Sequence, residues 1–302
     1  MKKYIIGITI FFVCFFCADR LVGYISDYLV EHAISGETQK NEYICDRTNE
    51  DILIMGSSRA VHHYDPRIIE DSLGLSCYNC GYDGCGSITA YGLLNILSKR
   101  YSPKVIIYEI TPEFDYLQYD KKDNTKYLGP LKKYYDREGI DSIFMAISPT
   151  ERWKMYSYMY RINSKSIQML SENILKRNET IKGFHTKEIS MSYEPDIDDT
   201  RKDLEYDDVK ILYLKKIISL CKKADIKLVF SVSPSYKKAD PYAYSYAEDL
   251  ARGNDIPFIS HYSDTFINRN KENFYDQIHM NMKGAQTFTK VFVSELRNII
   301  NK

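Results

Sequence analysis

The chain has 302 residues, which is enough for one large domain or two small ones. Its 41 lysines and arginines balance its 41 aspartates and glutamates, so the formal net charge is zero. Because a general nucleic-acid binder carries a basic excess or a basic stripe, this balance argues against nucleic acid as a partner.

The N-terminus combines two lysines with an uninterrupted apolar run from Tyr4 to Cys17. A basic flank before an apolar segment favours a cytoplasmic N-terminus and export of the following residues. The run is shorter than the roughly 20 residues of a spanning helix, but a helix that continues through Asp19 and Arg20 would span, with those charges near the interface. No small-x-small cleavage site follows closely. We therefore predict a membrane anchor over residues 1–27 with an extracytoplasmic body, periplasmic or at the cell surface. A cleaved signal and a secreted body are the alternative.

Five cysteines lie beyond the apolar segment, an odd number for an exported domain. The spacing Cys77-x-x-Cys80 invites a metal or redox interpretation, but a zinc site would need a second ligand pair at comparable spacing, and the sequence has none. Small buried thiols are the simpler interpretation. The adjacent His62 and His63 do not predict a metal site either, because neighbouring residues on a helix point apart. We expect no metal and no cofactor.

Continuous apolar runs alternate with helical patterns along the body of the chain. We predict strands over Asp51–Met55, Leu75–Cys80, Lys104–Ile110, Lys227–Val232 and Pro257–Ser260. We predict helices over Pro66–Leu73, Ile88–Lys99, Val209–Lys222, Tyr242–Arg252 and Lys283–Ile299. Runs of this kind are typical of strands that helices cover on both faces. The order predicts an α/β protein, a three-layer α/β/α sandwich with a mainly parallel five-stranded sheet.

One segment interrupts this alternation. Residues 116–203 are rich in Tyr, Lys and Ser and lack good strand patterns, so we predict a mainly helical insertion after the third strand. Residues 28–48 are assigned to a linker, and residues 49–302 to the main domain that contains the insertion.

The first strand runs directly into Gly56, Ser57 and Ser58. In an open parallel sheet, ligands bind beyond the carboxyl ends of the strands, so Ser58 is expected to be exposed over that crevice. A serine nucleophile needs a base that a third group orients. Asp276 and His279, three residues apart before the last helix, can supply both, with the carboxylate holding the tautomer of the ring.

These residues carry a resemblance to the SGNH/GDSL hydrolase superfamily. Gly56-Ser57-Ser58 resembles its first block, the stretch from Asn79 to Gly84 its second, and the Asp276-x-x-His279 spacing its last. The resemblance implies the flavodoxin-like SGNH fold, a catalytic triad of Ser58, Asp276 and His279, and an oxyanion hole formed by Ser58 and Gly84. Ser57 replaces the usual aspartate, which is similar to the membrane-anchored branch that assists acylation of cell-envelope polymers.

One block departs from the family pattern. The asparagine that donates to the oxyanion is expected after the third strand, where this chain places Glu113, whose carboxylate cannot donate. Arg59, next to the nucleophile, is predicted either as a donor or substrate clamp or as a surface ion pair. With Asn79, these residues form the predicted substrate-binding set.

The function expected from this reading is an exported serine esterase or O-acyltransferase acting on acyl groups of a cell-envelope glycan or related polymer. Its partners would be that acylated polymer, the membrane through the anchor, and a multispanning acyltransferase. Two alternatives remain open: an esterase or lipase of small esters, and a non-catalytic carbohydrate-binding module of the same fold.

Overall fold

The computed structural model describes residues 1–118, 123–163, 165–176, 180–195, 205–236, 241–262, 264–268 and 270–301. The chain divides into two compact units. Unit 1 contains Met1–Tyr43 and Leu128–Glu179, and unit 2 contains Ile44–Tyr127 and Thr180–Lys302. The sheet and all predicted site residues belong to unit 2.

A five-stranded parallel sheet forms the centre of unit 2, as predicted. Its strands are β1 (Ile52–Gly56), β2 (Cys77–Asn79), β3 (Val105–Glu109), β4 (Lys227–Val232) and β5 (Phe258–Ser260). They lie in the order β2-β1-β3-β4-β5, and every neighbouring pair is parallel. This is the doubly wound order whose switch point, between β1 and β3, is the usual place for a ligand. The register aligns Gly56 with Glu109 and Glu109 with Ser231, so β1 and β3 end at the same level and β4 extends one residue further.

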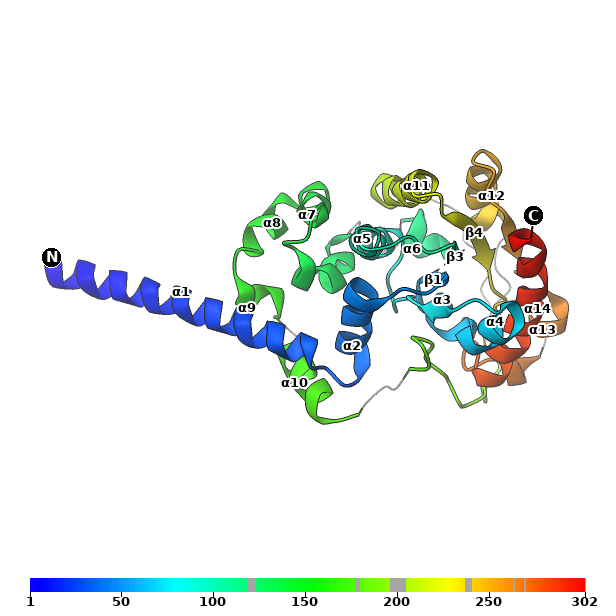
Figure 1. The fold of residues 1–302 in the computed structure, drawn as a ribbon, viewed down its shortest axis with the longest axis horizontal. Coiled ribbons are helices and arrows are strands. Elements are labelled where there is room, and N and C mark those ends of the chain that lie inside the picture. Colours follow the sequence, from blue (N-terminus) through cyan, green and yellow to red (C-terminus); the bar gives the residue numbers. More distant parts are fainter. Residues whose placement is uncertain are drawn as a thin grey trace. The chain divides into compact units, whose positions relative to one another are not determined.

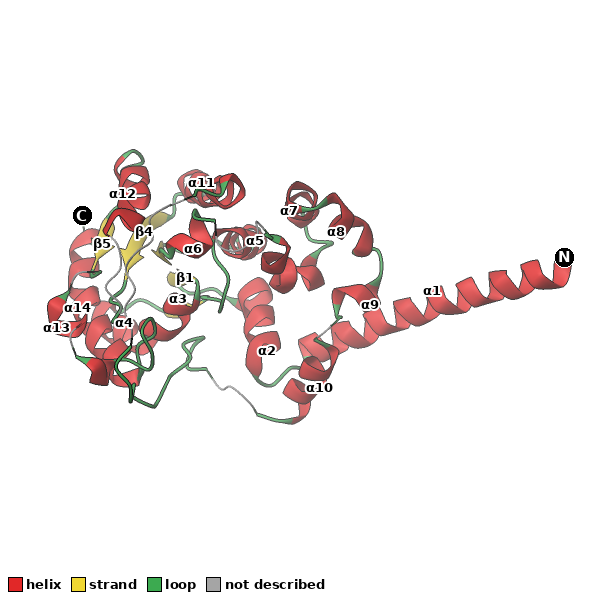
Figure 2. Cartoon of the chain, turned by 180° about the vertical axis from the view of Figure 1, so that it is seen from behind, coloured by secondary structure: helices red, strands yellow, loops and turns green. Residues whose placement is uncertain are grey.

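Helices cover both faces of this sheet (Figure 1). One layer contains α3 (Ser58–His63), α4 (Pro66–Leu73) and α14 (Met282–Ile300), and the other contains α5 (Ser87–Leu97) and α11 (Asp208–Lys223). The view from behind shows the strands between the two layers (Figure 2). The three-layer α/β/α prediction is therefore confirmed. The shorter helices of the unit are α6 (Pro112–Asp115), α12 (Ser245–Arg252) and α13 (Thr265–Asn268), with 3-10 turns at Pro241–Tyr244 and Lys271–Asn273. A further 3-10 segment, Thr125–Tyr134, begins in unit 2 and continues into unit 1.

Alternate strand residues supply the core on each face. Ile52 and Ile54 of β1 are fully buried and belong to one cluster with Phe288 and Phe292 of α14. Leu53, between the two isoleucines, is also fully buried, on the opposite side of the pleat. Each large apolar side chain buried in this way contributes about 1.5–3 kcal/mol. The apolar runs of the sequence are continuous because helices cover both faces of the sheet, so that successive side chains of a strand are all buried.

Unit 1 is helical in its described residues. It comprises α1 (Lys2–Glu31), α2 (Gly36–Glu42), α7 (Ile140–Ile147), α8 (Pro149–Lys154), α9 (Tyr158–Arg161) and α10 (Ser166–Ile174). The prediction of a helical insertion agrees with α7 to α10; residues 119–122, 164, 177–179 and 196–203 of that prediction lie outside the described residues. The linker prediction for residues 28–48 is wrong, because α1 extends to Glu31 and the following residues form α2 and a π-helical turn at Tyr43–Arg47.

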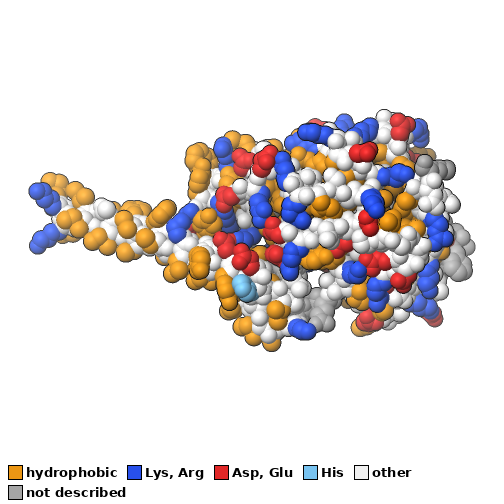
Figure 3. All heavy atoms as spheres, viewed as in Figure 1, with side chains coloured by type: hydrophobic (Ala, Val, Ile, Leu, Met, Phe, Trp, Pro, Cys, Tyr) orange, Lys and Arg blue, Asp and Glu red, His pale blue; other side chains and the backbone are white. Residues whose placement is uncertain are grey.

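Helix α1 is long and apolar enough to cross a membrane, as a membrane anchor or a signal sequence would be. Hydrophobic side chains cover the visible face of its N-terminal half (Figure 3). Further along, the carboxylate of Asp19 accepts hydrogen bonds from the Ser157 hydroxyl and from the backbone amides of Tyr158 and Met159, at 2.7–3.1 Å. Asp19 therefore caps the start of α9, and the apolar stretch that precedes it is the part of α1 without such polar contacts to the body.

Candidate active site

The end of β1 explains why a glycine precedes the two serines. Gly56 has a φ of 135°, a conformation that side chains rarely adopt, and a Cβ there would lie 2.6 Å from the backbone oxygen of Glu109. The chain then turns into α3 with Ser57 at its N-cap. Ser57 is fully buried, and its hydroxyl lies 2.7 Å from that of Thr111 after β3. Ser58 is half-buried, so the turn presents it and not Ser57 to solvent.

The structure brings the three predicted triad residues into one hydrogen-bonded series. Ser58 Oγ lies 2.8 Å from His279 Nε2, across 221 positions of the sequence. On the other side of the ring, His279 Nδ1 lies 2.8 Å from Asp276 Oδ2 and 3.1 Å from Oδ1. These are the contacts that a general base needs towards a serine and towards an orienting carboxylate.

A tight turn holds Asp276 in place. Its Oδ1 accepts the backbone amides of Ile278 and His279, both at 2.8 Å, so this oxygen is fixed as an acceptor. Burial by itself would raise the pKa of Asp276, but the hydrogen bond and charge of His279 and the two amides outweigh it and lower the pKa to about 2. The ionised carboxylate accepts the Nδ1 proton of His279, which leaves Nε2 as the acceptor facing Ser58. The prediction that this short spacing sets the tautomer is consistent with the geometry.

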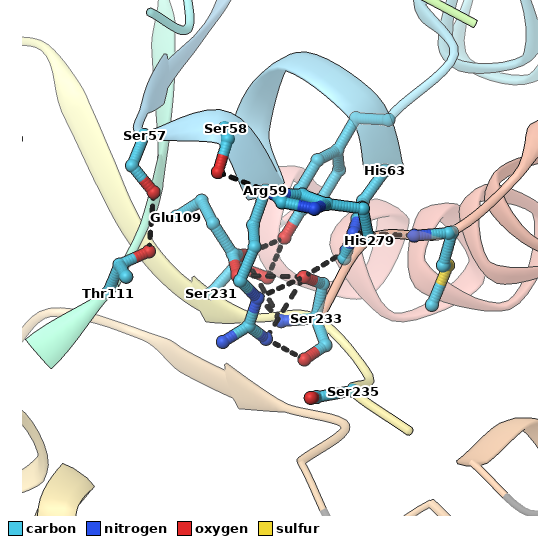
Figure 4. A network of polar contacts seen from close by, with 12 residues as sticks. Ser57, Ser58, Arg59, His63, Glu109, Thr111, Ser231, Ser233, Ser235 and His279 are labelled. Carbon is cyan, nitrogen blue, oxygen red and sulfur yellow. Dashed lines mark hydrogen bonds and ion pairs between the residues drawn. The ribbon is translucent and has the colours of Figure 1, made fainter. Parts of the chain in front are cut away.

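Arg59 is not at the surface. It is 3 % exposed and forms an ion pair of 3.1 Å with Glu109 at the end of β3. Its guanidinium also donates to the hydroxyl of Tyr244, at 2.8 Å. It donates further to Ser233 (Figure 4). The surface ion pair is therefore wrong, and the donor or clamp role has no support, since the guanidinium is committed to buried partners.

Glu109 is the centre of a buried polar network that the sequence analysis missed. Its carboxylate accepts the Ser233 amide at 3.1 Å, the Ser233 hydroxyl at 2.7 Å and the hydroxyl of Tyr64. Burial raises the pKa of Glu109, and Arg59 and these donors offset part of the rise. A signal was present, because Glu109 is the one charged residue inside an apolar strand pattern, and a buried charge needs partners.

His63 connects this network to the loop that carries His279. Its Nε2 accepts the backbone amide of Met280 at 3.0 Å, so the ring proton is on Nδ1, which donates to Ser233 Oγ at 2.7 Å. Burial, together with the positive charge of Arg59, lowers the pKa of His63 well below 6.5, so the ring is neutral. His63 thereby positions the residue next to His279 against α3.

The remaining predicted site residues have different fates. Gly84 lies in an exposed turn with a φ of 67°, open on the side where a Cβ would be. Asn79 is fully buried; its side-chain Nδ2 donates to Ala60 O at 2.7 Å, and its Oδ1 accepts the Gly81 amide at 3.0 Å. The substrate-binding role assigned to Asn79 is therefore wrong, and its side chain links β2 to α3 instead. Glu113 is half-buried in α6. Thr111, two residues earlier, has its hydroxyl 2.7 Å from that of Ser57.

The cysteine and histidine pairs behave as expected. Cys77 and Cys80 are buried free thiols, and burial raises the pKa of Cys77. His62 and His63 face different partners, because His62 Nε2 lies 3.2 Å from Asp83 whereas His63 bonds Ser233.

No protein-family model and no curated protein sequence matches the chain. The fold and the geometry around Ser58 are therefore the observations that bear on function.

Proposed function

We propose that this chain is a serine esterase or O-acyltransferase in which Ser58 carries the acyl group transiently. The observation that supports it best is the hydrogen-bonded series Ser58–His279–Asp276 at the carboxyl ends of a parallel sheet. His279 Nε2 takes the Ser58 proton as Oγ attacks the ester carbonyl, and then gives that proton to the leaving alcohol. Asp276 keeps the ring in the required tautomer and stabilises the imidazolium that forms.

The backbone amides of Ser58 and Gly84 are the proposed donors to the oxyanion. Donors of this kind act at about 2.7–3.1 Å from the developing charge, and the loss of one costs on the order of a hundredfold or more in rate. The Gly84 turn supports this role because no side chain of its own covers the amide. Glu113 belongs to the proposed substrate site, where it would hold a sugar hydroxyl and not the oxyanion.

The acyl groups of a cell-envelope glycan or related polymer are the proposed substrate. This part of the proposal rests on the Gly-Ser-Ser block and on α1, which would hold the body at the outer face of a membrane. Deacylation of Ser58 by water gives hydrolysis, and deacylation by a sugar hydroxyl gives transfer. A multispanning acyltransferase is the proposed source of the acyl group in the second case.

Active-site labelling tests the nucleophile directly. The full chain in detergent should react with a fluorophosphonate probe, which modifies an activated serine. Ser58→Ala should abolish labelling, whereas the matched control Ser57→Ala should keep it, because the Ser57 hydroxyl bonds Thr111 and not His279. Labelling of Ser58→Ala at the wild-type rate would refute the proposal, as would its loss in a folded Ser57→Ala alone.

A further inference from the structure

Three potential metal ligands meet beside α3, from three separate parts of unit 2. His62 comes from α3, Asp83 from the turn after β2, and His185 from the segment that follows residue 180. One ligand atom of each lies within 4.8 Å of the other two. His62 is buried, His185 half-buried and Asp83 exposed, so the group has a buried base and an open side.

The hydrogen bonding of His62 leaves a position for a cation. His62 Nδ1 lies 2.7 Å from the backbone carbonyl of His185, which can only accept, so Nδ1 carries a proton. The opposite nitrogen, Nε2, lies 3.2 Å from a carboxylate oxygen of Asp83. A ring nitrogen lone pair and a carboxylate oxygen at this separation can both bind one cation.

The backbone around the group is already held in place. The amide of His185 donates to Val61 O at 3.1 Å, next to the bond between the His185 carbonyl and His62. A histidine that ligates a metal commonly donates its other ring nitrogen to a carbonyl, which fixes the tautomer. His62 has this arrangement without any further rearrangement.

We propose that His62, Asp83 and His185 form a zinc site. Imidazole and carboxylate suit a transition metal, whereas magnesium and calcium prefer all-oxygen ligands. A tetrahedral zinc ion with bonds of about 2.0–2.2 Å keeps its ligand atoms about 3.3 Å apart, and the His62–Asp83 separation is 3.2 Å. His185 would close by about 1.5 Å at most, through side-chain rotation. Three protein ligands leave a fourth position for water or a substrate oxygen.

The site lies next to the serine–histidine pair. The rings of His62 and His279 are 5.4 Å apart between centroids and nearly perpendicular, and His62 is one helical turn after Ser58. The ion would fix the Asp83–Gly84 turn relative to Ser58 and so hold the Gly84 amide in place. The importance of this for catalysis rests on the proposed oxyanion role of Gly84, whereas zinc binding itself does not depend on the proposed function.

Direct titration tests the site. The full chain, purified in detergent with a tag that contains no histidine and stripped with a chelator, is titrated with zinc against a chromophoric indicator. One equivalent should bind, and millimolar magnesium should not compete. Cobalt should give the intense visible bands of a four-coordinate ion. Asp83→Asn and His185→Ala should each weaken binding at least about a hundredfold, whereas His32→Ala, a control in unit 1, should not.

Each outcome decides the proposal. Absence of stoichiometric zinc binding by the wild type would overturn it. Unchanged binding in both variants would place the zinc elsewhere and overturn it as well. Asp83 is exposed, so its substitution tests the site without removing a buried group. Ser58→Ala should keep full zinc affinity, so failed probe labelling and failed zinc binding are separate results.

Discussion

Replacing Asp276 by asparagine should almost abolish the reactivity of Ser58 while leaving the fold in place. In the wild type, Asp276 Oδ1 accepts two backbone amides at 2.8 Å, and Oδ2 faces His279 Nδ1 at 2.8 Å. The two amides require an acceptor, so the asparagine oxygen must take the Oδ1 position. Its NH2 group is then directed at Nδ1, where the wild type has an acceptor.

The size of the effect follows from that geometry. If His279 kept its proton on Nδ1, two donors would face each other, and each unsatisfied donor costs about 1–3 kcal/mol. The sum of about 2–6 kcal/mol corresponds to a population of the productive tautomer reduced by about 30-fold to about 25,000-fold. The favoured alternative carries the proton on Nε2, which cannot accept from Ser58. We expect the upper end of this range, because the amides of Ile278 and His279 prevent the asparagine from flipping.

The assay is the second-order rate of fluorophosphonate labelling, with p-nitrophenyl acetate hydrolysis as a second readout. The matched control is Asp264→Asn, which alters another Asp–His pair of the same spacing, with His261 Nδ1 at 3.3 Å from Asp264. The control should label like the wild type. A rate for Asp276→Asn within tenfold of the wild type would refute the role given to the carboxylate.

Three further predictions concern stability and topology. The pKa of His63 is lowered in the folded state by burial, so the unfolded state binds the proton first; the free energy of unfolding should be fully retained above pH 6.5 and fall below it by up to about 1.4 kcal/mol per pH unit. In urea unfolding between pH 7.5 and 5.5, the free energy of unfolding should depend less on pH for His63→Asn than for the wild type. An equal pH dependence of the two proteins would contradict this reasoning. Gly56→Ala should destabilise unit 2 by about 1–3 kcal/mol from backbone strain alone, more with the contact to Glu109, and an unchanged urea midpoint would be evidence against that strain. An alkaline-phosphatase fusion at the C-terminus should be active, because Lys2 and Lys3 favour a cytoplasmic N-terminus and therefore a body outside the cytoplasm. If only a cytoplasmic reporter at the same point were active, the predicted topology would be wrong.

Local patterns determined most of the architecture of unit 2. β4 begins and ends where its apolar run predicts, and α4 ends at Gly74, whose φ of 68° closes the helix. The Asp276–His279 pair was also predictable, because a spacing of three positions lets one turn bring the carboxylate and the ring together. These features depend on residues that are close together in the sequence, so the sequence alone is sufficient to predict them.

Other features depend on residues that only folding brings together. The N-terminus of α2 is capped by the carboxylate of Glu172, which accepts the amides of Glu37 and Thr38 at 3.2 and 3.1 Å, and a seven-residue helix has little stability without such support. The sequence near residue 36 does not predict that cap, because Glu172 is more than 130 positions away. This is why the segment was predicted as a linker.

The same distinction applies to the site. Ser58, Asp276 and His279 were identified as residue types in suitable settings, but the contact between Ser58 and His279 depends on how α3 and the loop before α14 pack on one sheet. Neither role predicted for Arg59, a donor or clamp or a surface ion pair, includes its partner Glu109. That residue lies at the end of β3, and the adjacency of β1 and β3 is decided by strand order. His185 reaches His62 from 123 positions away. Sequence periodicity specifies which residues are buried and where strands end. The pairing of polar side chains across elements is set by tertiary packing, because a buried charge or ring nitrogen is stable only where the folded chain supplies its partner.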